Sequence, residues 1–126
     1  MLKSFAVTAF AVVLAAGTAI AAEPTAMAPS AKNGMFVDAK GMTLYTFDKD
    51  TPGKSVCNGP CATNWPPLLA ADGAKASGSW SIVTRDDGHK QWAYKGKPLY
   101  GWTKDTKPGD TTGDGFLNGA WHVAKP

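Results

Sequence analysis

One ten-residue pattern occurs twice in this chain, and it constrains the fold more than any other feature. The decamers GMTLYTFDKD at 41–50 and GKPLYGWTKD at 96–105 share Gly, Leu-Tyr, an aromatic residue and Asp at the same places. Each then continues into Thr and a Pro-Gly pair, and Trp65 matches Trp121 after one further residue of offset. Matches this dense indicate two copies of one supersecondary unit, which pack together because one unit cannot bury its own apolar face. We therefore expect two tandem repeats related by an approximate two-fold axis.

The pattern along the rest of the chain is that of strands and turns. The sequence shows no helical periodicity, and short apolar or aromatic runs alternate with Gly, Asp and Pro-Gly, which is typical of strands and tight turns. The predicted fold class is all-β, with about six short antiparallel strands in a meander, sandwich or barrel. We expect these strands at 35–38, 42–47, 79–84, 90–94, 99–102 and 120–124.

The first 22 residues resemble an export signal. Lys3 precedes an apolar run from Phe5 to Ala16, and Ala19-Ile20-Ala21 is the small-residue pattern that signal peptidase recognises. The run is shorter than the roughly 20 apolar residues that a membrane-spanning helix needs. The sequence therefore predicts an exported protein, periplasmic or secreted, with no membrane span after cleavage.

The domain organisation follows from this reading. We expect a signal peptide at 1–22, a flexible linker at 23–32 and a single all-β domain at 33–126, with the repeats at about 34–70 and 80–124. The only two cysteines lie far from the cleavage site, so we expect no lipid anchor.

Each decamer presents apolar side chains on both faces of its strand. The leucine points to one face, and the tyrosine and the next aromatic residue point to the other. These residues are Leu44, Tyr45 and Phe47 in the first copy and Leu99, Tyr100 and Trp102 in the second. A strand of this kind is covered on both sides, so we expect both leucines and both tyrosine rings in one shared core.

The motif aspartates, Asp50 and Asp105, are candidate partners for the tyrosine hydroxyls. Five extended residues span about 16 Å, too far for Tyr and Asp of one copy to meet along a straight strand. Either the chain bends before each Asp, or each Tyr meets the Asp of the other copy. Because Asp before a Thr and a Pro-Gly pair commonly caps a loop through its own backbone, the motif is either structural or ligand-binding.

Cys57 and Cys61 are predicted to form a disulfide, because export leads to an oxidising compartment. Three intervening residues are enough to bring the two Cα atoms within bonding range. A redox pair is the alternative, although active dithiols usually have two intervening residues at a helix N-terminus.

Other chemistry has weaker support in the sequence. His89, His122, Met35 and Met42 are the soft candidate ligands for a metal, but no two of them have a recognised spacing. The 13 basic residues, which give a net charge of +3, form no stripe of the kind that binds nucleic acid. We predict no metal site, no cofactor, no nucleic-acid partner and no catalytic residues.

The motifs together resemble a known family. Both Tyr45-Thr-Phe47-Asp-Lys-Asp50 and Tyr100-Gly-Trp102-Thr-Lys-Asp105 fit Y-x-(F/W/Y)-x-x-D, and Cys-Asn-Gly-Pro-Cys-Ala-Thr-Asn-Trp-Pro-Pro-Leu follows at 57–68. These segments are similar to the secreted repeats of unknown function, the predicted lipoproteins with the Yx(FWY)xxD motif. The resemblance covers about 34–124 and implies a short extracytoplasmic protein of tandem repeats, with no established activity. The chain departs from the lipoprotein description in lacking a lipid-attachment cysteine.

Two functional hypotheses follow. The first is a non-enzymatic exported module that recognises a cell-envelope component or a protein through aromatic and Asp side chains, since exposed aromatic patches commonly mark interaction sites. The second is a redox or metal-handling accessory protein that uses Cys57 and Cys61 or His122.

Overall fold

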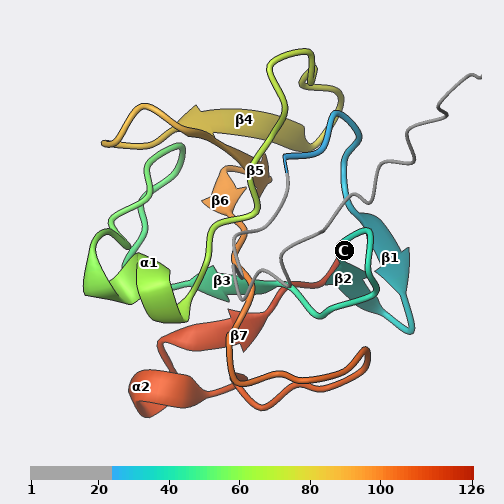
Figure 1. The fold of residues 1–126 in the computed structure, drawn as a ribbon, viewed down its shortest axis with the longest axis vertical. Coiled ribbons are helices and arrows are strands. Elements are labelled where there is room, and N and C mark those ends of the chain that lie inside the picture. Colours follow the sequence, from blue (N-terminus) through green and yellow to red (C-terminus); the bar gives the residue numbers. More distant parts are fainter. Residues whose placement is uncertain (1–23) are drawn as a thin grey trace, which may run out of the picture.

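The computed structural model describes residues 24–126, so the predicted signal peptide lies outside the described residues (Figure 1). Seven strands and two short helices follow one another along the chain. They are β1 (Ser30–Lys32), β2 (Met35–Val37), β3 (Tyr45–Phe47), α1 (Pro60–Asn64), β4 (Trp80–Thr84), β5 (Lys90–Tyr94), β6 (Lys97–Pro98), α2 (Phe116–Gly119) and β7 (Trp121–Val123).

The strands form three small antiparallel sheets, and no closed barrel is present in this part of the chain. β1 pairs with β2, β3 pairs with β7, and β4, β5 and β6 form a meander. Figure 1 shows β3 and β7 side by side, with the meander on one side of them and α2 on the other. The all-β prediction is confirmed. No helix in residues 24–126 has the length and apolar content needed to cross a membrane.

One predicted strand is wrong. The segment at 99–102 forms no regular strand, because three successive N–H groups pair with three different segments. Leu99 N–H donates to the carbonyl of Trp92 at 3.0 Å, Tyr100 N–H to Tyr45 at 2.9 Å, and Gly101 N–H to Pro66 at 2.8 Å. The segment therefore passes between neighbours and leaves only isolated bridges at Tyr100.

One strand was not expected. β1 occupies the last residues of the segment predicted to be a linker, and it pairs with β2 across a two-residue turn. Asn33 and Gly34 make this turn with φ of 54° and 77°. An Asn-Gly pair with both φ values positive is the preferred two-residue hairpin connection, and it was the local signal for this strand.

The pseudo-two-fold axis passes between Tyr45 and Tyr100. The N–H of each donates to the carbonyl of the other, at 2.8 Å and 2.9 Å. The next backbone hydrogen bonds outward also correspond between the copies. Ala124 N–H donates to the carbonyl of Leu44 at 2.8 Å, and Leu68 N–H donates to the carbonyl of Leu99 at 2.9 Å. The two copies of the motif are thus paired back to back at the centre of the molecule.

The core consists of two clusters rather than the one shared core that we expected. Leu44 and Leu99 lie in one cluster with Phe36 and Trp92, whereas Tyr45 and Tyr100 lie in the other. The physical reason is the strand alternation itself, since adjacent residues of an extended segment point to opposite faces. Both clusters nonetheless contain one member from each copy, so each is shared between the repeats.

Candidate functional site: the paired motif

The tyrosines and aspartates of the motif bond across the two copies. Tyr45 Oη donates to Asp105 Oδ2 at 2.6 Å, and Tyr100 Oη donates to Asp50 Oδ2 at 2.6 Å. Of the two geometries that the sequence left open, the structure has the crossed one. The aspartate of each copy therefore accepts a hydrogen bond from the tyrosine of the other.

The second oxygen of each aspartate caps its own loop. Asp50 Oδ1 accepts from Val56 N–H at 2.8 Å, and Asp105 Oδ1 accepts from Thr112 N–H at 2.9 Å. The second loop is one residue longer between the two bonded groups, which accounts for the extra residue of offset between Trp65 and Trp121. This is the backbone-capping role expected of Asp in such a loop.

Burial changes the acidity of these groups. The tyrosines are fully buried, and this burial, followed by the hydrogen bond to the partner aspartate, raises the pKa of Tyr45 and of Tyr100 well above the ordinary value. Burial also raises the pKa of Asp50, although the hydrogen bonds from Tyr100 and Val56 oppose it. Both tyrosines therefore remain neutral donors at any physiological pH.

A ladder of stacked rings crosses the same cluster. Phe47 stacks on Trp121 at 4.2 Å between ring centroids, Trp121 on Trp65 at 3.7 Å, and Trp65 on Trp102 at 3.9 Å. Phe116 follows Trp102 at 4.8 Å in a tilted arrangement. The first four rings alternate between the copies, because the third motif residue of each copy stacks on the tryptophan of the other, and Phe116 then follows Trp102 of its own copy. We call these five rings the aromatic ladder.

The tyrosines pack edge-on against the centre of the ladder. Tyr45 meets Trp65 at 5.3 Å and Tyr100 meets Trp121 at 5.1 Å, with interplanar angles of 79° and 86°. Edge-to-face contacts of this kind add about 0.5–1.5 kcal/mol beyond their buried area. In the structure the motif side chains thus join the two copies, with Phe47 and Asp50 half-buried and the other four buried.

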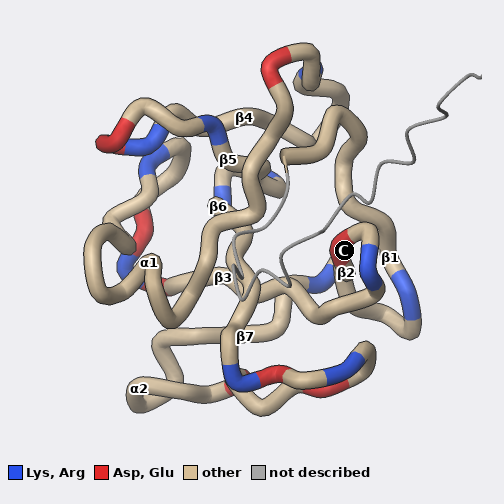
Figure 2. The backbone as a smooth tube through the Cα atoms, viewed as in Figure 1, with Lys and Arg blue, Asp and Glu red and all other residues tan. Residues whose placement is uncertain are grey.

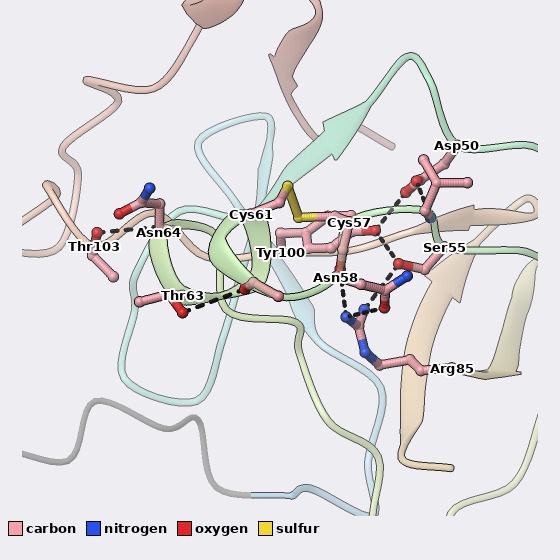
Figure 3. The surroundings of a disulfide bond; sticks show 12 residues. Asp50, Ser55, Cys57, Asn58, Cys61, Thr63, Asn64, Arg85, Tyr100 and Thr103 are labelled. Atoms are coloured by element: carbon pink, nitrogen blue, oxygen red, sulfur yellow. Dashed lines mark hydrogen bonds between the residues drawn. A yellow bond between two sulfur atoms is a disulfide. The ribbon is translucent and has the colours of Figure 1, made fainter. Parts of the chain in front are cut away.

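The predicted disulfide between Cys57 and Cys61 is confirmed (Figure 3). It closes the loop that leads into α1, and Cys57 is fully buried at its inner end. In the second copy the corresponding positions are Gly113 and Leu117, so that copy has no disulfide. A Cβ at Gly113 would lie 2.6 Å from the Trp65 ring, which leaves room for glycine only. The bond by itself favours neither the structural nor the redox hypothesis.

Arg85 is the main site residue that sequence reasoning missed. Its side chain is 1% exposed. Its guanidinium donates to Ser55 Oγ at 2.9 Å and to the carbonyl of Cys57 at 2.5 Å (Figure 3), and also to Gln91 Oε1 at 2.8 Å. Ser55 Oγ in turn lies 2.5 Å from Tyr100 Oη. The arginine therefore connects the disulfide loop to the motif. A signal existed, since Arg85 is the only arginine in a chain whose other cations are lysines.

The two candidate histidine ligands lie in different elements of the fold. His122 lies in β7, with its Nε2 2.7 Å from Asp48 Oδ2. His89 lies in the turn between β4 and β5, with its Nδ1 3.2 Å from Asp87 Oδ1. Within residues 24–126, no group of three or more His, Cys, Asp or Glu side chains is placed to hold a metal ion.

Comparison with known proteins supports the duplicated architecture. A family described as a secreted repeat of unknown function matches twice, at residues 28–69 and 81–125. No curated protein and no solved structure matches the chain significantly. The two matched segments coincide with the two copies that the crossed bonds join. This exported chain therefore belongs to the family of secreted repeats of unknown function.

Proposed function

We propose that this protein is a non-catalytic extracytoplasmic binding module that recognises a cell-envelope component or a protein through the exposed end of its aromatic ladder. The paired motif serves as the scaffold, because its hydroxyl and carboxylate groups are occupied by one another and by backbone N–H groups. The contact surface is the turn that carries Phe116 and Leu117.

The observation that carries the proposal is an apolar pair held at the surface by strained backbone. Phe116 is 46% exposed and Leu117 is 51% exposed. Leu117 and Asn118 both adopt the left-handed conformation, each with φ of 57°. This conformation costs roughly 1–2 kcal/mol per non-glycine residue. Strain of this kind persists where the surrounding structure enforces it, and it clusters at functional sites.

The ladder makes this turn a firm platform. Phe116 packs against Trp102 and, at 5.8 Å, against Trp65, so its inner side is supported while its outer side is open. An aromatic ring that is rigid before contact loses little conformational entropy on binding. The equivalent turn of the first copy, by contrast, contains the disulfide.

The test is retention on cell-envelope material. The mature protein would be incubated separately with purified cell-wall material, with membranes and with the soluble extracytoplasmic proteins of the producing cells. We expect retention on one fraction, lost in Phe116→Ser/Leu117→Ser and kept in Val56→Ser, which changes a residue that is 43% exposed elsewhere. Equal retention of the double variant and the control, or retention on no fraction, would refute the proposal.

A further inference from the structure

A cavity of about 330 Å³ lies on the face of the β3–β7 pair that points away from the ladder. Its wall includes Thr46 and His122, which are paired in the sheet register, and the turn between β5 and β6. Lys95, Lys97 and Lys125 are among its lining residues, and Tyr94 and Pro126 add apolar groups. The Lys95 Nζ lies 5.4 Å from the centroid of the Tyr94 ring. We call it the lysine cavity.

The cations of the lysine cavity have no acidic partner in the described part of the chain. None of Lys95, Lys97 and Lys125 belongs to the ion pairs within 4.0 Å found in residues 24–126. Asp48, the aspartate of the wall, instead lies 2.7 Å from His122 Nε2. Elsewhere the lysines are spread over turns and strands, and several alternate with acids along the loop before α2 (Figure 2).

The pseudo-symmetry shows that the fold does not require these groups. Gly101 of the second copy occupies the place of Thr46 in the first, and Pro66 of the first copy occupies the place of His122 in the second, and the backbone bonds are retained. Thr103 N–H donates to the carbonyl of Asn64 at 3.1 Å, as Asp48 N–H donates to that of Ala120 at 2.8 Å. The polar wall is therefore an addition to one face of a symmetric scaffold.

Lys95 is held in a conformation that does not suit it. Its φ is 49°, and it precedes Gly96 in the two-residue turn between β5 and β6. Asn or Gly would form such a turn with less strain. Lys40, at the equivalent place before Gly41, has no positive φ. A lysine kept at a strained position beside a cavity is the kind of outlier that suggests a functional contact.

We propose that the lysine cavity binds a phosphate group carried on a small organic group, for which glycerol phosphate serves as the probe. Lysine ammonium groups bind phosphate as point charges, and the apolar wall suits the carbon skeleton beside it. The volume lies at the low end of the roughly 300–1,000 Å³ typical of small-molecule sites. Free glycerol phosphate and a phospholipid headgroup present the same chemistry, and the experiment separates these sources. The lysine cavity is on a different surface from Phe116 and Leu117. A test that refutes one of the two proposals therefore leaves the other unaffected.

The experiment titrates the mature protein at low salt with glycerol 3-phosphate, with glycerol and, separately, with vesicles of phosphatidylglycerol or phosphatidylcholine. Amide NMR shifts and calorimetry report binding to the small probes, and co-sedimentation reports binding to vesicles. We expect saturable shifts at Thr46, Lys97 and His122 with glycerol 3-phosphate and none with glycerol, or else retention on the phosphatidylglycerol vesicles only. The first result assigns a soluble ligand and the second a headgroup.

Matched lysine variants test whether the lysine cavity is the site that binds the phosphate group. Lys97→Gln/Lys125→Gln should weaken binding by roughly tenfold or more, the equivalent of about 1.4 kcal/mol. Lys32→Gln/Lys40→Gln removes the same charge from other places and should change affinity by less than about twofold, since distant exposed charges are screened. The single variant Lys95→Gln replaces the double if the latter does not fold. Equal weakening by both pairs, shifts confined to other residues, or no saturable binding of either probe would overturn the proposal.

Discussion

The loop after Asp50 contains a disulfide and contacts a buried arginine, whereas the loop after Asp105 contains neither. Both loops are capped by the aspartate that begins them, and both aspartates hold the tyrosine of the other copy. In the first loop Cys57 is bonded to Cys61 and its carbonyl accepts from Arg85. In the second loop a glycine lies against Trp65 instead.

This difference separates what the duplicated fold requires from what each copy has added. The crossed bonds and the four stacked rings have counterparts in both copies, so they define the pairing, whereas Phe116 has Pro60 at the matching position. The disulfide and the Arg85 contacts occur in one loop only. The second loop is left with an exposed Leu117 at the position of Cys61, and this is the surface that we assign to binding.

The largest expected effect tests whether the two copies are equivalent in the core. Leu44→Ala and Leu99→Ala should each lower the free energy of unfolding by about 2–5 kcal/mol, because both side chains are fully buried and leave a cavity. Denaturant unfolding measures the change, and Leu117→Ala, at an exposed position, should cost less than about 0.5 kcal/mol. A large cost at one leucine and a negligible cost at the other would contradict the pseudo-symmetry.

A second prediction concerns the loop that has the disulfide. Reducing Cys57–Cys61 should lower the stability by about 2 kcal/mol in the chain-entropy model, because the reduced chain regains freedom in the unfolded state. The melting temperature should fall, and amide exchange should accelerate around α1 while α2 is unchanged. The variant Cys57→Ser/Cys61→Ser controls for the reductant. Unchanged stability together with rapid dithiol exchange would instead favour the redox hypothesis.

The smallest effect is a pH dependence of the stability that comes from Asp50. Burial raises the folded-state pKa of Asp50 above its ordinary value of 3.8, so the folded protein binds this proton more tightly than the unfolded chain does. The contribution of Asp50 to the free energy of unfolding should therefore fall as pH rises from about 3.8 through the raised pKa, and should stay constant above it. The difference in unfolding free energy between the wild type and Asp50→Asn isolates this slope from the other carboxyl groups. A difference that grows in the opposite direction would show that the carboxylate, rather than the acid, is favoured in the folded state.

Much of this architecture could be predicted from the sequence because it rests on repeated local patterns. The spacing of the two decamers predicted two copies of one unit. The alternation of Leu44 and Tyr45 predicted that both faces of the strand are covered. The close spacing of the cysteines gave the disulfide. The distance argument also reduced the Tyr–Asp contacts to two geometries, of which one occurs.

The remainder depends on contacts between distant segments, which no local pattern encodes. The backbone at 99–102 reads as a strand, yet its successive N–H groups pair with three separate segments. Arg85 follows a strand at a turn, where a cation is normally solvated, but the disulfide loop covers it. The β1 hairpin is different, since its Asn33-Gly34 turn is a local signal that is present in the sequence.

The measurement that tests the crossed pairing most directly is a set of double-mutant cycles on unfolding free energy. Tyr45→Phe with Asp105→Asn, and Tyr100→Phe with Asp50→Asn, should each show a coupling of about 1–3 kcal/mol, because a buried hydroxyl donates to a carboxylate in both pairs. The same-copy cycles, Tyr45→Phe with Asp50→Asn and Tyr100→Phe with Asp105→Asn, should show coupling below about 0.5 kcal/mol. Strong coupling within each copy and none between copies would contradict the account.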